Sequence, residues 1–274
     1  MRLSIAVELD YDFPQPADVL LTVEAAQLPD QVLIEDRLTI DGVGPLRPIA
    51  GGDGVGRRTW MRAEGGFHAA YRALVDVERP LSAIDRLAAE PLRELPPEVI
   101  PYLWPSRYCE ADRFESFVDR HFAEWQGGAR ILAMADWIHR QLDYQPGSSD
   151  ATTTAADTFV SRRGVCRDYA HLLAAFARAA GIPARLVSAY GWKVDPPDFH
   201  ALVEVWLKGG WYLVDPSCLA PIESVVRICV GRDATDIAFM TIFGTSDMRA
   251  QSVAVERVDP AAVAGLAPPG GAAY

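Results

Sequence analysis

The sequence has few cysteines, and they are not spaced for a structural role. Its 274 residues contain four, at irregular intervals and without a C-x-x-C pair: Cys109, Cys166, Cys218 and Cys229. This spacing argues against both a disulfide framework and a zinc site. A phosphate-binding signature is also missing, since the glycine-rich stretch GGDGVG at 51–56 runs into RRTW and is typical of a hairpin turn. We therefore expect neither a metal nor another cofactor.

Long apolar runs are absent as well. No uninterrupted stretch is long enough to span a bilayer, and the opening MRLSIAVELDYDF lacks the apolar core and cleavage site of a signal peptide. Instead Leu3, Ile5, Val7 and Leu9 alternate with more polar residues, as in a half-buried strand. These features predict a cytoplasmic protein with no membrane partner.

Positive charge is in deficit. The chain has 26 Lys and Arg residues against 37 Asp and Glu, which gives a net charge of -11. The mean field of such a chain repels phosphate backbones, so nucleic acid is not an expected partner. Half of the residues are apolar, which is enough for a sizeable core in one large or two ordinary domains.

The apolar pattern divides the chain into two regions. Residues 1–100 contain short apolar runs broken by proline and glycine, which predicts an N-terminal β-sandwich-like domain. A segment with five prolines, 91–109, acts as a linker, and helical periodicity begins after it. We expect an α+β domain over 101–260 and a flexible tail over 261–274.

The stretch RRGVCRDYAHLLAAFARAAGIPARLV, residues 162–187, places Cys166 on the first turn of a predicted helix. Unpaired backbone N–H groups and the helix dipole at that end favour a thiolate over a thiol. Gly164 lets the backbone turn closely into the helix, which leaves the Cys166 N–H free to bind an oxyanion. The alternative is a small buried hydrophobic residue in a helix–sheet core.

Two further residues complete a candidate set of nucleophile, base and orienting group. His200 opens one predicted strand, and Asp215 ends the next strand and precedes a proline. Cysteine, histidine and aspartate are the residue types of a cysteine-dependent acyl-transfer site. Each also has an ordinary alternative, because a histidine at a strand edge is often solvated and an aspartate before proline often forms a turn.

Strand geometry adds a condition to this hypothesis. If the hairpin turn between the two strands is Gly209–Gly210, Asp215 faces Glu204 and lies about 13 Å along the strand from His200. The two side chains then share a face but do not touch. We therefore expect a bulge, a longer turn or a strong twist between residues 200 and 215.

Two blocks of this region resemble the transglutaminase-like superfamily: GVCRDYAHLLAAFARAAGIPARLVSAY and FHALVEVWLKGGWYLVDPS. They occur in order, with 34 residues from Cys166 to His200 and 15 from His200 to Asp215. The resemblance covers about residues 110–245, and SRYCEADRF at 106–114 is similar to the bacterial branch. One departure is Leu202, which stands where many members have an aromatic residue.

The resemblance implies a papain-like α+β core, in which a helix bearing the cysteine packs on an antiparallel sheet, preceded by an all-β N-terminal domain. It implies that Cys166 is the nucleophile, that His200 forms an ion pair with it and later acts as the acid, and that Asp215 holds the imidazole tautomer. It gives Cys109 no catalytic role.

Three further residues are candidates for support or substrate binding. Asp168 occupies a family-like position and is interpreted as a support for the first helical turn, with a solvated charge as the alternative. Trp192 and Tyr169 are the other two. For Trp192, packing against the sheet is the alternative to a place in the substrate wall.

The leading hypothesis is an enzyme that acts on an amide or peptide bond of a peptide or protein through a thioester, with hydrolysis as the expected outcome. Because the thioester is common to both outcomes, crosslinking by transfer to an amine, or another acyl transfer, stays open. A coenzyme A donor would need basic residues, and only Arg162, Arg163 and Lys193 lie nearby. The remaining alternative is a non-catalytic protein-interaction module.

Overall fold

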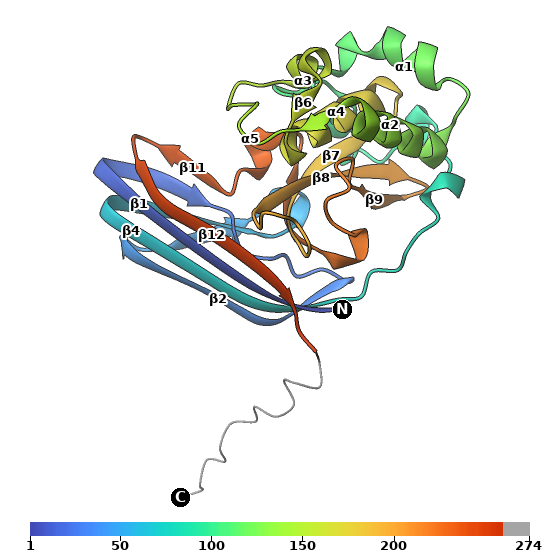
Figure 1. Cartoon of the computed structure of the whole chain (residues 1–274). Coiled ribbons are helices and arrows are strands. Elements are labelled where there is room, and N and C mark those ends of the chain that lie inside the picture. The colour runs from blue at the N-terminus through green and yellow to red at the C-terminus, as the bar shows by residue number, and fades with distance from the viewer. Residues whose placement is uncertain (260–274) are drawn as a thin grey trace, which may run out of the picture.

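The computed structural model describes residues 1–259, in which a long-stranded sheet and a compact α+β unit lie side by side (Figure 1). The predicted flexible tail, 261–274, lies outside the described residues. The predicted α+β class is confirmed, because the helix that carries Cys166 packs on an antiparallel sheet.

Six strands form the first sheet, and all neighbouring pairs in it are antiparallel. The hydrogen-bonded order is β11-β1-β4-β2, with β12 also paired to β1 and β3 to β4. The GGDGVG stretch joins β3 to β4, so the predicted hairpin turn is confirmed. The strands are β1 (Arg2–Leu21), β2 (Gln31–Val43), β3 (Arg47–Ala50), β4 (Arg57–Val77), β11 (Met240–Phe243) and β12 (Asp247–Arg257).

The two-residue periodicity of β1 decides which face of this sheet is buried. Leu3, Ile5 and Val7 are buried, while the residues between them are half-exposed. The pairing of β1 with β4 shifts between Phe13 and Ala17, where two prolines cannot donate ladder hydrogen bonds. Figure 1 shows the strands bending at this end of the sheet and returning toward the helices. The region is therefore one bent sheet and not the pair of facing sheets that a sandwich has.

The last two strands do not belong to the second unit. β12 pairs with β1 from Leu3 to Asp12, and β11 pairs with β1 from Asp18 to Leu21. The chain thus returns from the α+β unit to the N-terminal sheet, which the assignment of residues 101–260 to one domain did not foresee. Strands far apart in sequence complete one sheet because an unpaired edge of β1 is costly to leave exposed.

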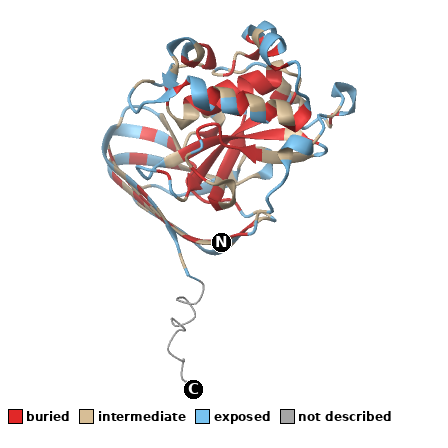
Figure 2. Cartoon of the chain, turned by 45° about the vertical axis from the view of Figure 1, so that its right-hand side comes forward, coloured by how far each residue is buried: buried red, intermediate tan, exposed pale blue. Residues whose placement is uncertain are grey.

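The second unit contains a four-stranded antiparallel sheet of order β10-β7-β8-β9 and the α-helices of the described chain. Residues of α4, β7 and β8 are buried along most of their length, and Figure 2 shows buried residues concentrated in the middle of this unit. The helices are α1 (Glu115–Phe122), α2 (Gly127–Gln141), α3 (Ala155–Ser161), α4 (Cys166–Ala179) and α5 (Ala234–Ile237). The strands are β7 (Ala184–Gly191), β8 (Phe199–Leu207), β9 (Gly210–Val214) and β10 (Val225–Gly231), and a short parallel pair joins β5 (Asp143–Tyr144) to β6 (Arg163–Gly164).

The hairpin of β8 and β9 differs from the prediction in its register. Leu207 pairs with Gly210, so the turn is Lys208–Gly209, one residue earlier than expected. Both turn residues have positive φ, 46° and 78°, as a two-residue hairpin loop requires. The expected bulge or longer turn is wrong, because this register places Asp215 only two residues out of line with His200 instead of four. Long side chains on one face span such a diagonal.

The two units share one hydrophobic core. Tyr71 of β4 stacks on Tyr190 of β7 with ring centroids 6.4 Å apart. The Tyr190 hydroxyl donates to the carbonyl of Val23 at 2.5 Å, and the Tyr71 hydroxyl accepts from the Ala25 N–H at 2.9 Å. These contacts hold the end of β1 against the sheet of the second unit.

Candidate active site

Cys166 is the first residue of α4, and a network of hydrogen bonds determines where that helix begins. The Asp168 carboxylate accepts from the Val165 N–H at 2.8 Å, which satisfies a backbone donor at the helix start. A Cβ atom on Gly164 would lie 2.7 Å from the Asp168 Cβ, so only glycine leaves room for this carboxylate. Gly164 therefore helps to position Cys166, because it leaves room for the Asp168 carboxylate that holds the start of the helix.

Asp168 is fully buried, so it is not the solvated charge that the sequence left as an alternative. Arg167 pairs with it at 3.1 Å and also donates to the Ser149 hydroxyl and to the Asp150 carbonyl, at 3.2 and 2.8 Å. These bonds join the first turn of α4 to the loop before α3. They stabilise the local backbone on which the Cys166 thiol is carried.

His200 and Asp215 are in direct contact. His200 Nε2 lies 2.8 Å from Asp215 Oδ2, and both side chains are almost completely buried. The other ring nitrogen, Nδ1, is buried and has no hydrogen-bond partner among the described residues. Cys166 and His200 line the same cavity, whose volume is about 400 Å³. The three residues that the sequence singled out are therefore brought together.

The Asp215 carboxylate is held by several donors. It lies just beyond β9 and accepts from the Ser217 N–H at 2.9 Å, the Ser217 hydroxyl at 2.6 Å and the Ala220 N–H at 3.2 Å. A buried carboxylate with this many hydrogen bonds has a strongly favoured charged form and little freedom to turn. It therefore orients the imidazole of His200.

The electrostatics of the pair favour a charged imidazole. Burial lowers the pKa of His200, but the hydrogen bond to Asp215 and the nearby Cys166 side chain outweigh it and raise that pKa to about 10. Burial likewise raises the pKa of Asp215, and the bond to His200 more than offsets this, so that the net shift is downward. The contact with Asp215 thus favours the charged form of the His200 imidazole.

The rest of the cavity wall is mainly apolar. Phe199 of β8 stacks on Phe239, with ring centroids 4.5 Å apart and planes within 4°. Ile237 and Thr241 also line the cavity, as do Arg107 and Tyr108. Apolar surroundings exclude water and strengthen the electrostatic interactions of the reacting groups.

Tyr169 and Trp192 do not line this cavity. The Tyr169 hydroxyl is inside the fold and donates to the Leu142 carbonyl at 2.7 Å. The Trp192 ring packs under the Lys193 ammonium, which lies 4.7 Å from its centroid, and near Arg257. Both residues have structural contacts that account for them, and the alternative of packing against the sheet region describes Trp192 better.

Tyr144 is a candidate site residue that the sequence analysis missed. It pairs in β5 with Gly164 of β6, two residues before Cys166. Partial burial and the Cys166 side chain raise the pKa of its hydroxyl, and the Cys166 backbone partly opposes the rise. The hydroxyl thus lies near Cys166. No local pattern marks this tyrosine, because its proximity depends on a parallel pair of two-residue strands.

The other cysteines differ from Cys166 in their surroundings, and none of the four is paired in a disulfide. Burial raises the pKa of the Cys109 and Cys229 thiols to about 12. Burial and the charge of Asp215 also raise the pKa of the exposed Cys218. Within residues 1–259 no group of metal-ligating side chains is found, and no helix there is long and apolar enough to cross a membrane.

A cysteine at the start of a central helix, facing a His–Asp pair on an antiparallel sheet, defines the papain-like class of folds. The family model of the transglutaminase-like superfamily matches residues 123–216. A solved structure from Cytophaga hutchinsonii, whose assignment as a cysteine protease is provisional, is 32% identical and superposes with a TM-score of 0.89 over 94% of this chain and 91% of that one. The chain belongs to the transglutaminase-like superfamily.

Curated relatives match over shorter segments. An uncharacterised protein of Mycobacterium leprae is 37% identical over 50% of this chain and 52% of its own length. A protein-glutamine gamma-glutamyltransferase of Pseudomonas aeruginosa is 43% identical over 22% of this chain and 10% of its own length. The matches thus span about half or less of the curated relatives.

Proposed function

We propose that this protein is a cysteine-dependent acyl-transfer enzyme that cleaves an amide or peptide bond of a peptide or protein. Cys166 is the nucleophile, His200 the proton-transfer group and Asp215 the residue that orients His200. The acyl group passes through a thioester and is released to water. The reaction requires no metal and no cofactor.

The main support for this proposal is that the two ring nitrogens of His200 have different surroundings. Nε2 lies 2.8 Å from a carboxylate oxygen of Asp215, and because an ionised carboxylate can only accept a hydrogen bond, Nε2 bears a hydrogen. In the neutral ring Nδ1 is then the acceptor, and it is buried, without a partner among the described residues, and on the cavity shared with Cys166. The thiol proton is the one that this nitrogen is placed to accept.

The steps follow from these positions. The Cys166 thiolate attacks the carbonyl carbon, and the resulting oxyanion accepts from the Cys166 backbone N–H and from the Tyr144 hydroxyl. The imidazolium of His200 gives its Nδ1 proton to the leaving amine as the carbon–nitrogen bond breaks, which leaves a thioester. Nδ1 then takes a proton from water, whose oxygen attacks the thioester and releases a carboxylic acid and the thiolate.

A direct test is the alkylation rate of each cysteine by iodoacetamide between about pH 5 and 9, read by peptide mass spectrometry. We expect Cys166 to react fast at the acidic end of this range, and His200→Ala to slow it. Cys218 is the internal control, since it is exposed and its thiol pKa is raised. Equal rates for Cys166 and Cys218 in both proteins would favour a non-catalytic interaction module instead.

The acceptor of the acyl group needs a separate measurement. The gamma-glutamyltransferase among the relatives is the reason to consider transfer to a primary amine as the second candidate. Incubation with a glutamine-containing peptide and a dansylated alkylamine separates the two outcomes by mass, because both release ammonia from the side-chain amide: hydrolysis leaves a carboxylic acid about 1 Da heavier, and transfer leaves the amide of the dansylated amine. We expect hydrolysis to dominate. Product that contains mainly the dansyl group would reverse the assignment.

We also propose that the protein acts in the cytoplasm. Its four cysteines are unpaired, as in proteins of a reducing compartment. Cell fractionation with an antibody against the chain measures this, and recovery from a membrane or extracellular fraction would contradict it.

A further inference from the structure

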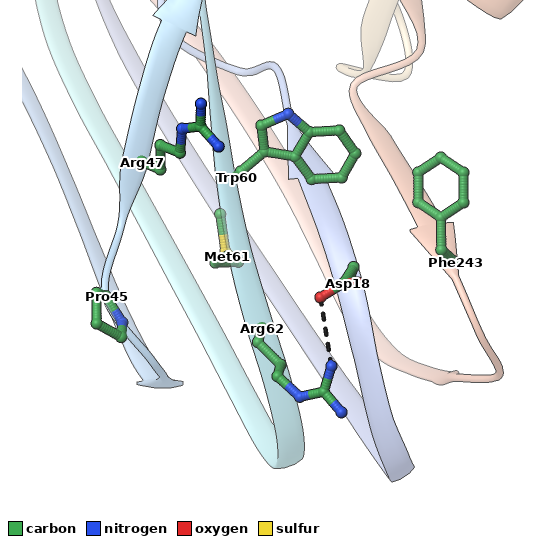
Figure 3. Close-up of a pocket in the computed structure, with 7 residues that line it drawn as sticks. All are labelled: Asp18, Pro45, Arg47, Trp60, Met61, Arg62 and Phe243. Carbon is green, nitrogen blue, oxygen red and sulfur yellow. Dashed lines mark ion pairs between the residues drawn. The ribbon is translucent and has the colours of Figure 1, made fainter.

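A groove on the N-terminal sheet has no role in the reaction proposed above. Seven residues of four strands and one turn line it, and its volume is about 550 Å³ (Figure 3). They are Asp18, Pro45, Arg47, Trp60, Met61, Arg62 and Phe243. The groove lies on the part of the sheet that returns toward the helices after the bend.

Strand register places the aromatic and basic side chains of this groove on one face. Thr241, Leu20, Trp60 and Arg47 are paired in sequence across β11, β1, β4 and β3, so they form one row. The next row contains Phe243 and Asp18 with Arg62. Figure 3 shows Arg47, Trp60 and Phe243 in that order across the strands.

The same face continues into the catalytic cavity. Thr241 lines the cavity with Cys166, while Phe243 lines the groove. These two residues of β11 are two positions apart, so their side chains lie on one face about 7 Å from each other. The spacing equals two residues of an extended peptide, and one strand therefore connects the two sites.

The groove combines exposed apolar surface with unneutralised positive charge. The Trp60 and Phe243 rings are in contact, with centroids 5.7 Å apart, and yet Phe243 is 63% exposed. Arg62 pairs with Asp18 at 3.6 Å, whereas Arg47 has no ion pair or side-chain hydrogen bond within residues 1–259. Such positive charge contrasts with the net charge of -11 of the whole chain.

We propose that this groove binds a second segment of an extended polypeptide substrate, a few residues away from the amide that reacts at Cys166. An aromatic or large aliphatic side chain of the substrate packs on the Trp60–Phe243 pair, and an adjacent acidic side chain pairs with Arg47. The inference rests on the proposed function and makes it more specific, because a small amide would reach only the cavity. It selects polypeptides with a neighbouring apolar and acidic residue.

The test uses synthetic octapeptides that carry a chloroacetamide on a central side chain. Cys166 alkylation forms the sulfur–carbon bond and expels chloride, so its rate reports how well each peptide is held. A Phe-Glu pair is placed two to four residues from the reactive group on either side, and matched peptides carry Ala-Glu or Phe-Lys. We expect the best Phe-Glu peptide to react about tenfold faster than Ala-Glu.

Variants assign the difference to the groove. Phe243→Ala and Trp60→Ala are expected to remove the advantage of Phe over Ala, and Arg47→Glu to reverse the preference between Phe-Glu and Phe-Lys. Exposed residues elsewhere supply matched controls, Trp125→Ala for the aromatic change and Arg93→Glu for the charge reversal, and these keep the wild-type preferences.

The design separates failure of the groove from failure of the proposed function. Iodoacetamide is too small to contact the groove while it reacts with Cys166. Every groove variant should therefore keep the wild-type rate of Cys166 alkylation by iodoacetamide. If that rate is normal and the three peptides react equally, the groove proposal is overturned and the enzyme proposal stands. If Cys166 is not activated, binding to the groove can still be measured by the fluorescence anisotropy of a labelled, unreactive Phe-Glu octapeptide added to Cys166→Ala. Equal affinity of this peptide for Cys166→Ala with and without the additional change Arg47→Glu would overturn the groove proposal.

Discussion

At the scale of single residues, the proposed chemistry depends on a charged imidazole that is kept inside the protein. His200 is buried, and an isolated buried imidazolium is unfavourable. The carboxylate of Asp215, 2.8 Å from His200 Nε2, supplies one negative charge that compensates it, and in the proposed mechanism the sulfur of Cys166 supplies the other. The positive charge is therefore a property of the three residues together and of none of them alone.

Replacing the carboxylate by an amide tests this directly. In Asp215→Asn the shape is kept and the negative charge is lost, so the pKa of His200 should fall from about 10 toward its ordinary value. We expect iodoacetamide alkylation of Cys166 at pH 6 to slow about tenfold or more, with the acid limb of the pH profile displaced. Asp136→Asn on the exposed face of α2 is the control. An unchanged profile in Asp215→Asn would remove Asp215 from the site.

The proposed mechanism gives the Tyr144 hydroxyl a different role, as a donor to the substrate oxyanion. Tyr144→Phe should reduce kcat on a peptide amide by about 100-fold, the usual effect of one lost oxyanion donor. Alkylation of Cys166, which forms no oxyanion, should be nearly unchanged. Equal losses in both measurements would show instead that Tyr144 supports the thiolate.

At the scale of secondary structure elements, His171 links the central helix to one wall of the cavity. It is fully buried in α4, its Nε2 accepts from the Ala234 N–H at 3.1 Å, and its ring stacks on Tyr108 at 5.1 Å. Asp233 accepts from the Tyr108 N–H at 3.1 Å and from the Thr235 N–H at 2.9 Å. These bonds position α5, whose residues line the cavity.

Acid should loosen this connection. Burial lowers the pKa of His171 to about 3, against an effect of Asp233 in the opposite direction. Because the unfolded chain takes up the proton near pH 6.5 and the folded one does not, the contribution of His171 to stability is complete above that pH and declines as pH falls toward 3. In urea unfolding measured between about pH 4.5 and 7.5, the unfolding free energy of His171→Asn should decrease less on acidification than that of the wild type. Parallel slopes for the two proteins would contradict this.

At the scale of the whole molecule, buried ion pairs and shared strands join the two units. Glu204 of β8 is fully buried between Arg185 and Arg227, at 2.7 and 2.8 Å. Arg185 also pairs with Asp53 at 2.7 Å, and Arg227 pairs with Asp30, so the network reaches two turns of the N-terminal sheet. β12 adds a second connection because it pairs with β1.

This arrangement predicts a single cooperative unfolding transition. Glu204→Leu leaves two buried guanidinium groups without their common partner and should lower the unfolding free energy by about 3–5 kcal/mol. Glu98→Leu, at an exposed site, should change it by less than about 0.5 kcal/mol. Chemical denaturation followed by both tryptophan fluorescence and circular dichroism measures this. Two separate transitions would show that the sheet and the α+β unit unfold independently.

The sequence by itself determined the class of the fold and pointed to the three residues of the candidate site. Two-residue alternation in β1, helical periodicity around Cys166 and the order of Cys166, His200 and Asp215 are all local patterns or fixed spacings. They can be interpreted without knowing which segments meet. Proposed boundaries near residue 100 remain predictions, because the two units share one core and one network of ion pairs.

Only the tertiary structure decided how distant segments meet. The hairpin register that brings Asp215 to His200 depends on which two residues form the turn. The turn is Lys208–Gly209, one residue earlier than expected, and this shift was enough to make the expected bulge wrong. Tyr144 reaches Cys166 through pairing with a strand nineteen or more residues away, and Phe243 joins Trp60 because β11 returns to β1. Such contacts are set by packing and strand pairing over long separations, for which the local sequence carries no periodic signal.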